Sequence, residues 1–250
     1  MIKKNDNWFV CERPSVNTKL RLICIPYAGA GAAVYRTWGQ QLGSAIEVCT
    51  VQLPGRENRI NESPFNQIQP LVEKLADALG PYANTPYALY GHSMGALVAF
   101  ELAHTLRMRE ISMPTALLLG AHRAAHLPLN RPLLHTLSDT KFLEKICEFG
   151  GFSNEALVSH ELLELVLPTL RADFTVCETY VFENRPPLGC QIHAFAGKSD
   201  QDVSPAEIAP WGELTAKQFT MHQFDAGHFF IHSHLDLLLQ KLRQILLSER

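Results

Sequence analysis

The sequence predicts an α/β fold in which a mainly parallel central sheet is flanked by helices. Short apolar runs of strand length alternate with helical patterns along most of the chain, as they do where helices join parallel strands. A strand-like run, a glycine-bounded turn and a helix-like run follow one another around Ser93. The 250 residues suffice for one large domain with a complete hydrophobic core. We therefore expect residues 1–250 to form a single domain.

Six apolar runs are the predicted strands of this sheet. They cover residues 20–26, 46–53, 85–90, 115–120, 191–196 and 218–224. Three amphipathic patterns with a helical period predict helices that cover the faces of the sheet. They cover residues 71–79, 96–106 and about 232–247. No internal repeat and no low-complexity linker interrupts this order.

Residues 124–187 break the alternation, because they contain two helical patterns and no convincing strand. One apolar stripe covers residues 142–149, with Ser138 as its N-terminal cap, and the next covers residues 162–167, opened by Ser159. A segment of this length between two strands is too long for a simple connector. We predict a helical lid inserted in the domain, whose leucine and phenylalanine side chains suit a substrate with an apolar body. The alternative is that these apolar faces pack only on the core.

Composition and charge indicate which partners to expect. The net charge is −3 without a basic stripe, so we expect no nucleic-acid partner. No apolar run reaches the length of a membrane span, and no apolar stretch follows the basic N-terminal residues. We therefore expect no membrane partner and a cytoplasmic location. The six cysteines are scattered without a C-x-x-C pair, which predicts reduced thiols and neither a metal nor another cofactor. We expect a monomer.

A G-x-S-x-G pattern surrounds Ser93, running from Gly91 to Gly95. It follows the strand-like run 85–90 and opens the helix-like run 96–103. That setting is typical of a nucleophile elbow, a strained strand-to-helix turn that exposes the serine hydroxyl above the sheet. The two glycines keep Cβ atoms out of the crowded turn. The pattern therefore predicts a serine nucleophile and, more specifically, an α/β-hydrolase fold.

A serine hydroxyl becomes a good nucleophile only when a base accepts its proton and a third group orients that base. In folds with this elbow an acid and then a histidine follow the serine, on loops after later strands. Among eleven histidines, His228 lies in a turn just beyond the last predicted strand, so we predict it as the base. Its rivals lie within that strand or near the last helix: His222, His232 and His234. The acid should follow the strand 191–196, where we favour Asp200, with Asp202 as the alternative and Asp225 as a weaker third choice.

Two backbone amides are predicted to stabilise the oxyanion. The amide after the nucleophile belongs to Met94, at the start of a helix whose N-terminus favours negative charge. The loop 26–32 follows the first predicted strand, and its small residues let amides approach a ligand closely. We predict the Ala28 amide as the second donor, with Tyr27 as the fallback. A dinucleotide-binding loop is disfavoured, because Val34 occupies the third glycine position of G-x-G-x-x-G.

Together these segments resemble the stand-alone type II thioesterases that accompany nonribosomal peptide and polyketide synthases. The resemblance covers nearly the whole chain and is carried by residues 26–31, 52–59, 91–95, 167–174, 197–200 and 227–230. The Pro-Gly-Arg-Glu stretch at 54–57 and the Leu-Arg-Ala-Asp stretch at 170–173 matter most, because hydrolases at large do not share them. Tyr27 is a departure, since many relatives carry histidine there.

The resemblance implies hydrolysis of acyl groups from the phosphopantetheine arm of an acyl or peptidyl carrier protein, which frees a blocked synthase or releases a product. Ser93 would form an acyl-enzyme intermediate, and water activated by His228 would release the acid. A carboxylester hydrolase or an acyltransferase of the same fold is an alternative, because the lid decides which second nucleophile enters. A non-catalytic binding module is a second alternative, although it would be expected to lack part of the triad.

Three residues are candidates for substrate binding: Tyr27, His92 and Arg56. His92 lies within the elbow itself, and there we expect it mainly to shape the turn. Arg56, Glu57 and Arg59 match the family pattern, yet they could equally belong to a structural, salt-bridged loop. The same alternative applies to Arg171 and Asp173 in the lid.

Overall fold

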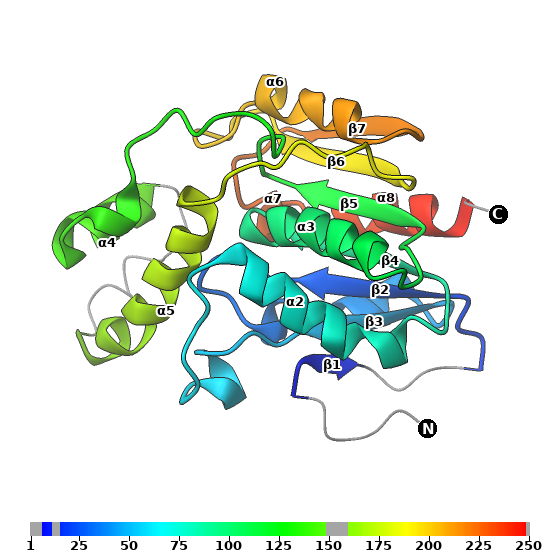
Figure 1. The fold of residues 1–250 in the computed structure, drawn as a ribbon, viewed down its shortest axis with the longest axis horizontal. Helices are drawn as coiled ribbons and strands as arrows, with labels where there is room; N and C mark the ends of the chain where they lie inside the picture. Colours follow the sequence, from blue (N-terminus) through cyan, green and yellow to red (C-terminus); the bar gives the residue numbers. More distant parts are fainter. Residues whose placement is uncertain (1–6, 12–15, 149–159, 249–250) are drawn as a thin grey trace.

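A computed structural model describes residues 7–11, 16–148 and 160–248, whose elements are shown in Figure 1. Seven strands form one sheet in the order β1-β3-β2-β4-β5-β6-β7. β1 pairs with β3 in the antiparallel sense and all other neighbours are parallel, which confirms the predicted mainly parallel sheet. The strands are β1 (Phe9–Cys11), β2 (Leu20–Ile25), β3 (Ile46–Val51), β4 (Tyr87–His92), β5 (Ala116–Gly120), β6 (Gln191–Gly197) and β7 (Phe219–Phe224).

Helices cover both faces of the sheet, with α2 and α3 on one face and α1 and α8 on the other (Figure 1). The helices of the described residues are α1 (Trp38–Leu42), α2 (Ile68–Leu79), α3 (Met94–Met108), α4 (Asp139–Glu148), α5 (His160–Glu178), α6 (Pro205–Ile208), α7 (Phe230–Ser233) and α8 (Leu235–Ser248). The short 3-10 helices are η1 (Ala32–Tyr35), η2 (Glu57–Arg59), η3 (Gly80–Tyr82), η4 (Leu134–Thr136) and η5 (Ala209–Leu214). Within the described ranges, no helix has the length and apolar character needed to cross a membrane.

The central strands are buried on both faces, which explains why they are continuous apolar runs. Along β4, Tyr87 and Leu89 pack into the α2–α3 layer, whereas Ala88 and Tyr90 pack into the α1–α8 layer. This alternation follows from the two-residue period of a strand. The two cores fix the sheet, and the loops at the carboxyl ends of its parallel strands are free to build a site.

The predicted lid contains α4 and α5, which lie beside the sheet at the left of Figure 1. The lid has a small hydrophobic cluster of its own: Leu134, Phe142, Ile146 and Leu170. The helix α5 continues through Pro168. Phe149, at the end of the first predicted stripe, and Ser159, the predicted start of the second, lie outside the described residues.

Two expectations from the sequence are corrected. The structure joins Cys11 to Cys49 by a disulfide, because the antiparallel pairing of β1 with β3 sets these residues opposite one another with Cα atoms 4.1 Å apart. The sequence predicts reduced thiols throughout, and the other four cysteines are indeed free. The last predicted helix is two helices, α7 and α8, with His234 between them.

The helix α3 approaches the sheet so closely that two positions in the elbow have room only for glycine. A Cβ atom added to Gly91 would lie 1.9 Å from the carbonyl oxygen of Gly95. One added to Gly95 would lie 2.2 Å from the carbonyl oxygen of Ile25, at the end of β2. Both obstacles are backbone atoms, so no side-chain rotation can relieve the overlap. The elbow therefore brings the start of α3 directly against the carboxyl ends of β2 and β4.

We expect Gly91→Ala to lower the free energy of unfolding by about 3 kcal/mol or more, because the added Cβ must displace the start of α3. Gly80→Ala is the matched control, since its Cβ meets nothing within 4 Å and its backbone is right-handed helical. We expect the control to change stability by less than about 1 kcal/mol. Urea unfolding of both variants measures the difference, and equal stabilities would contradict the packing constraint.

Candidate active site

Ser93 occupies the sharp turn between β4 and α3. Its backbone angles are φ 53° and ψ −120°, in a region that residues other than glycine rarely adopt. The Ser93 amide donates a 2.8 Å hydrogen bond to the carbonyl oxygen of Gly120, at the end of β5. Because α3 begins at Met94, the first amides of that helix lie next to the serine and have no partner within the helix. This is the geometry of a nucleophile elbow.

His228 and Asp200 form a buried pair next to the elbow. His228 Nδ1 lies 2.8 Å from Asp200 Oδ2. The other carboxylate oxygen, Oδ1, accepts hydrogen bonds from the amides of Asp202 at 2.8 Å and Val203 at 3.2 Å. The two residues meet because β6 and β7 pair in parallel, so the loops after them leave the same edge of the sheet. With Nδ1 engaged, the second ring nitrogen of His228 is left for a nucleophile.

The two rival carboxylates have other partners. Asp202 forms an ion pair with Arg131. Asp225 is exposed and lies 2.8 Å from the Nζ atom of Lys198. The geometry therefore favours Asp200 as the acid.

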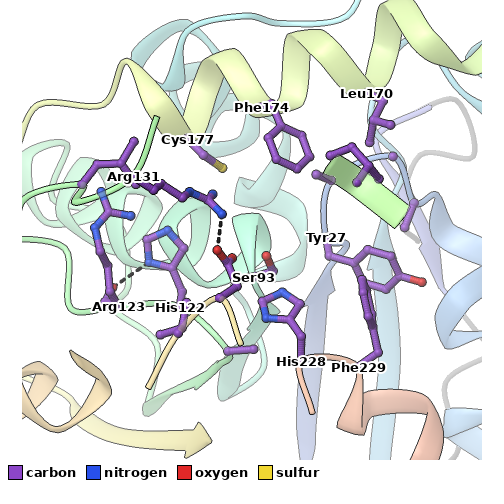
Figure 2. Close-up of a pocket in the computed structure, with 18 of the residues that line it drawn as sticks. Tyr27, Ser93, His122, Arg123, Arg131, Leu170, Phe174, Cys177, His228 and Phe229 are labelled. Atoms are coloured by element: carbon purple, nitrogen blue, oxygen red, sulfur yellow. Dashed lines mark hydrogen bonds and ion pairs between the residues drawn. The ribbon is translucent and has the colours of Figure 1, made fainter. Parts of the chain in front are cut away.

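A cavity of about 270 Å³ includes both Ser93 and His228 in its lining. Figure 2 shows the two side chains next to one another, with Tyr27 and Phe229 close to the histidine. Apolar side chains from the lid form one side of the cavity: Ile146, Leu170 and Phe174. The other side is polar and includes His122, Arg123 and Arg131 (Figure 2). Ser93, the predicted nucleophile, thus lies between an apolar wall and a polar wall.

The loop after β2 forms one edge of this cavity. It makes a tight turn closed by a 3.0 Å hydrogen bond from the Ala30 amide to the Tyr27 carbonyl oxygen. Gly29 lies within the turn at φ 78°, a conformation that favours glycine. Tyr27 and Ala28 both line the cavity, as expected of residues near the reacting group. The amides of Met94 and Ala28 remain the predicted oxyanion donors.

The thioesterase-domain family model matches residues 20–246 of the sequence. The chain belongs to the thioesterase family. It is 37% identical to the gramicidin S biosynthesis protein GrsT of Aneurinibacillus migulanus, over 98% of this chain and 97% of that protein. It is similar in structure to the thioesterase RedJ from the prodiginine biosynthetic pathway of Streptomyces coelicolor, with a TM-score of 0.86 and 39% identity over 91% of this chain and 90% of that one. The type II thioesterase BorB from the borrelidin biosynthetic cluster gives a TM-score of 0.87 and 36% identity, over 96% and 97% of the two chains. These similarities confirm the predicted α/β-hydrolase fold.

Arg56 of this thioesterase is absent from the described residues that line the cavity. Its guanidinium makes two hydrogen bonds to the carboxylate of Asp173 on α5, at 2.7 and 2.8 Å. The two residues are only 6% and 3% exposed. Arg59 and Arg171 likewise pair with acidic neighbours. These contacts favour the structural alternative over a direct contact of Arg56 with substrate.

His92 is buried under the loop that carries His228 and, among the described residues, does not line the cavity. Its Nε2 atom donates a 2.9 Å hydrogen bond to the carbonyl oxygen of His228. Burial, and then the neighbouring His228, lower the pKa of His92 well below its usual range, so the ring stays neutral. This placement supports a role in shaping the elbow. Tyr27, in contrast, faces the cavity, and its hydroxyl lies 2.8 Å from Nε2 of His232.

Sequence reasoning missed the polar wall of the cavity. His122 and Arg123 lie in the loop after β5, and Arg131 lies further along the same segment. Burial, and then Arg123, lower the pKa of His122 to about 3, so this ring is also neutral, and its Nδ1 atom donates to the carbonyl oxygen of Arg123. No motif marks these residues. The one available signal was their position after the carboxyl end of a central parallel strand, where α/β sheets place ligand-binding loops.

We expect Asp200→Asn to reduce kcat by roughly 10³- to 10⁴-fold, because an amide cannot stabilise the imidazolium that forms at His228. Asp202→Asn is the matched control in the same loop, and we expect its kcat to stay within about tenfold of the wild type. Steady-state kinetics on a thioester substrate, with circular dichroism to verify folding, compare the two variants. A larger loss of kcat for Asp202→Asn would reverse the assignment.

We also expect kcat/KM to fall as the pH decreases, because protonation of His228 removes the base. His92 and His122 cannot account for this loss, since burial lowers the pKa of each ring far below the neutral range. A pH profile of hydrolysis, restricted to the range in which the protein stays folded, measures the effect. Activity that stayed constant down to about pH 4 would contradict a histidine base.

Proposed function

We propose that this protein is a type II thioesterase that hydrolyses acyl groups from the phosphopantetheine arm of acyl or peptidyl carrier proteins. The observation that carries the proposal is the buried Asp200–His228 pair beside the strained Ser93 at the cavity. Membership of the thioesterase family supplies the reaction class. GrsT, named for gramicidin S biosynthesis, and the type II thioesterase BorB are similar over nearly their full lengths, and this supports a carrier-bound substrate.

In the first half of the proposed reaction, Ser93 Oγ attacks the thioester carbonyl carbon and His228 Nε2 accepts the serine proton. Asp200 holds the imidazole by Nδ1 and stabilises its positive charge. Negative charge develops on the carbonyl oxygen, where the amides of Met94 and Ala28 donate hydrogen bonds. The carbon–sulfur bond then breaks, and the pantetheine thiolate takes the proton from His228. The acyl group remains on Ser93 as an ester.

In the second half, water attacks this ester and gives a proton to His228. The second tetrahedral intermediate uses the same two amides. Its collapse breaks the bond to Ser93 Oγ, which recovers the proton from His228, and the free acid leaves. A thiolate leaves readily, so breaking the carbon–sulfur bond needs little catalysis. The demanding step is the attack on the carbonyl carbon, which creates negative charge on its oxygen. Ser93 and His228 promote the attack, and the same two amides stabilise the charge.

The lid, residues 124–187, is proposed to select the acyl group. Ile146 of α4 and Leu170 and Phe174 of α5 form the apolar wall of the cavity, where an acyl chain would exclude water. A carboxylester hydrolase or an acyltransferase would need the same nucleophile and base. Only the preferred acyl donor and acceptor distinguish these functions from a thioesterase.

We expect a carrier-bound acyl thioester to be hydrolysed with a kcat/KM at least about tenfold higher than that of a simple ester with the same acyl group. Acyl-coenzyme A, which presents the same thioester without a carrier protein, isolates the contribution of the carrier. Mass spectrometry of the acids released from a panel of acyl-loaded carriers measures hydrolysis, and Ser93→Ala is the control. Preferential cleavage of the ester, with the carrier-bound thioester left intact, would refute the proposal.

Labelling with a fluorophosphonate separates the enzyme from a non-catalytic binding module. The folded wild type should be labelled at Ser93, and the Ser93→Ala protein should not. A folded wild type that resisted labelling would favour the binding module.

A further inference from the structure

The turn that carries the predicted oxyanion donor is held from outside by the lid. The hydrogen bond between Ala30 and Tyr27 closes the turn, Gly29 has φ 78°, and Ala28 is not among the residues with positive φ. These features define a type II turn, with Gly29 at its third position. The amide of Gly29 is the central amide of the turn, and it donates a 2.7 Å hydrogen bond to Asp173 Oδ2.

Asp173 is itself fixed by Arg56. The guanidinium binds both carboxylate oxygens and also donates to the carbonyl oxygen of Ala30, at 3.1 Å. Arg56 therefore holds the last residue of the turn while Asp173 holds its central amide. The ion pair is nearly inaccessible to water, so few other groups can replace its hydrogen bonds.

A second contact fastens the same part of α5 to the Pro-Gly-Arg-Glu loop. Thr169 Oγ1 donates a 2.6 Å hydrogen bond to the carbonyl oxygen of Gly55. Leu170 packs so closely on the turn that a Cβ added to Gly29 would lie 2.8 Å from its Cδ1 atom. The helix and the turn thus form one packed unit.

The hydrogen bond to Asp173 selects the type of turn. Type I and type II turns differ by a rotation of about 180° of the central peptide. That rotation would turn the Gly29 amide away from Asp173 and direct the carbonyl oxygen of Ala28 at the carboxylate. The resulting repulsion opposes the rotation, so the peptide between Ala28 and Gly29 keeps one orientation.

We infer that Asp173, held by Arg56, is a positioning residue that fixes the oxyanion-binding turn through the amide of Gly29. The inference rests on the proposed function, because it takes the Ala28 amide as an oxyanion donor. Asp173 touches no reacting atom. It acts by anchoring the turn: the fixed central peptide holds the Cα atom of Ala28, next to which the Ala28 amide lies, and an amide misplaced by about 1 Å can cost roughly 100-fold in rate.

Two double variants separate this role from a purely structural one. Arg56→Met with Asp173→Asn removes both charges but keeps a side-chain oxygen that can accept from the Gly29 amide. Arg56→Met with Asp173→Leu removes both charges and the acceptor. We expect the Leu variant to lose at least about 30-fold in kcat with KM within about threefold, and the Asn variant to stay within about fivefold of the wild-type kcat.

Binding of an acyl trifluoromethyl ketone gives an independent readout, because the hemiketal oxygen that it forms with Ser93 occupies the oxyanion site. Its inhibition constant should rise in the Leu variant by about the same factor as kcat falls. Equal kcat values for the two double variants, or an inhibition constant that does not change, would overturn the inference.

If the Leu variant does not fold, Asp173→Glu replaces it. This variant keeps the charge for Arg56 but moves the carboxylate by one methylene, so kcat should fall at least about tenfold with KM within about threefold. A wild-type kcat for folded Asp173→Glu would overturn the inference. The proposed function fails separately: hydrolysis that survives in Ser93→Ala would refute it, whereas a preference for esters would refute the substrate and still allow the variants to be compared on an ester.

Discussion

The close approach of α3 to β2 and β4 is the constraint on which the site depends. A Cβ atom on residue 95 would lie only 2.2 Å from the carbonyl oxygen of Ile25, so glycine at this position lets the helix begin directly above the end of the sheet. That start forces Ser93 into its positive φ, exposes the hydroxyl and aims the first helical amides at one point. Because β2 ends at the same place, the turn that follows it is already within reach of the serine. Parallel pairing of β6 with β7 then brings Asp200 and His228 to the same edge.

Local patterns predicted most of this arrangement, because a few consecutive residues are enough to identify the elbow, each apolar strand and the turn around His228. The predicted helix 71–79 and strand 191–196 agree with α2 and β6 to within three residues. The short strand β1 escaped prediction, since three residues that depend on pairing with β3 carry little periodic signal. The pairing of Arg56 with Asp173 was not predicted for a different reason. Asp173 lies 117 residues away in the sequence, and charge alone does not show which carboxylate a guanidinium binds.

The buried ion pair of Arg56 with Asp173 also explains why the stretches 54–57 and 170–173 belong to the resemblance, although they carry no reacting group. Removing an arginine and an aspartate from water costs several kcal/mol for each ion, and their mutual attraction offsets this cost only where the remaining hydrogen-bonding atoms are also satisfied. Here the backbone of Pro54 and Ala30 accepts from the guanidinium, and the Gly29 amide donates to the carboxylate. An apolar pair of similar volume could fill the same space but could not accept from Gly29. The charged pair therefore fixes the orientation of the Ala28–Gly29 peptide, which an apolar pair would leave free.

Helical geometry places the cavity-lining residues and this support on the same turns of α5. Thr169 and Asp173, four residues apart, bind the loops beneath the helix, whereas Leu170 and Phe174, also four apart, face the cavity. The second pair is offset from the first by one position in the sequence, which places the two faces about 100° apart around the helix axis. A shift of α5 that widened the cavity for a bulkier acyl group would consequently move Asp173 relative to Gly29. In the proposed mechanism, the size of the acyl group and the alignment of the predicted oxyanion donor are thus coupled through a single helix, so an acyl group that fits the cavity without moving α5 would leave the donor aligned for attack.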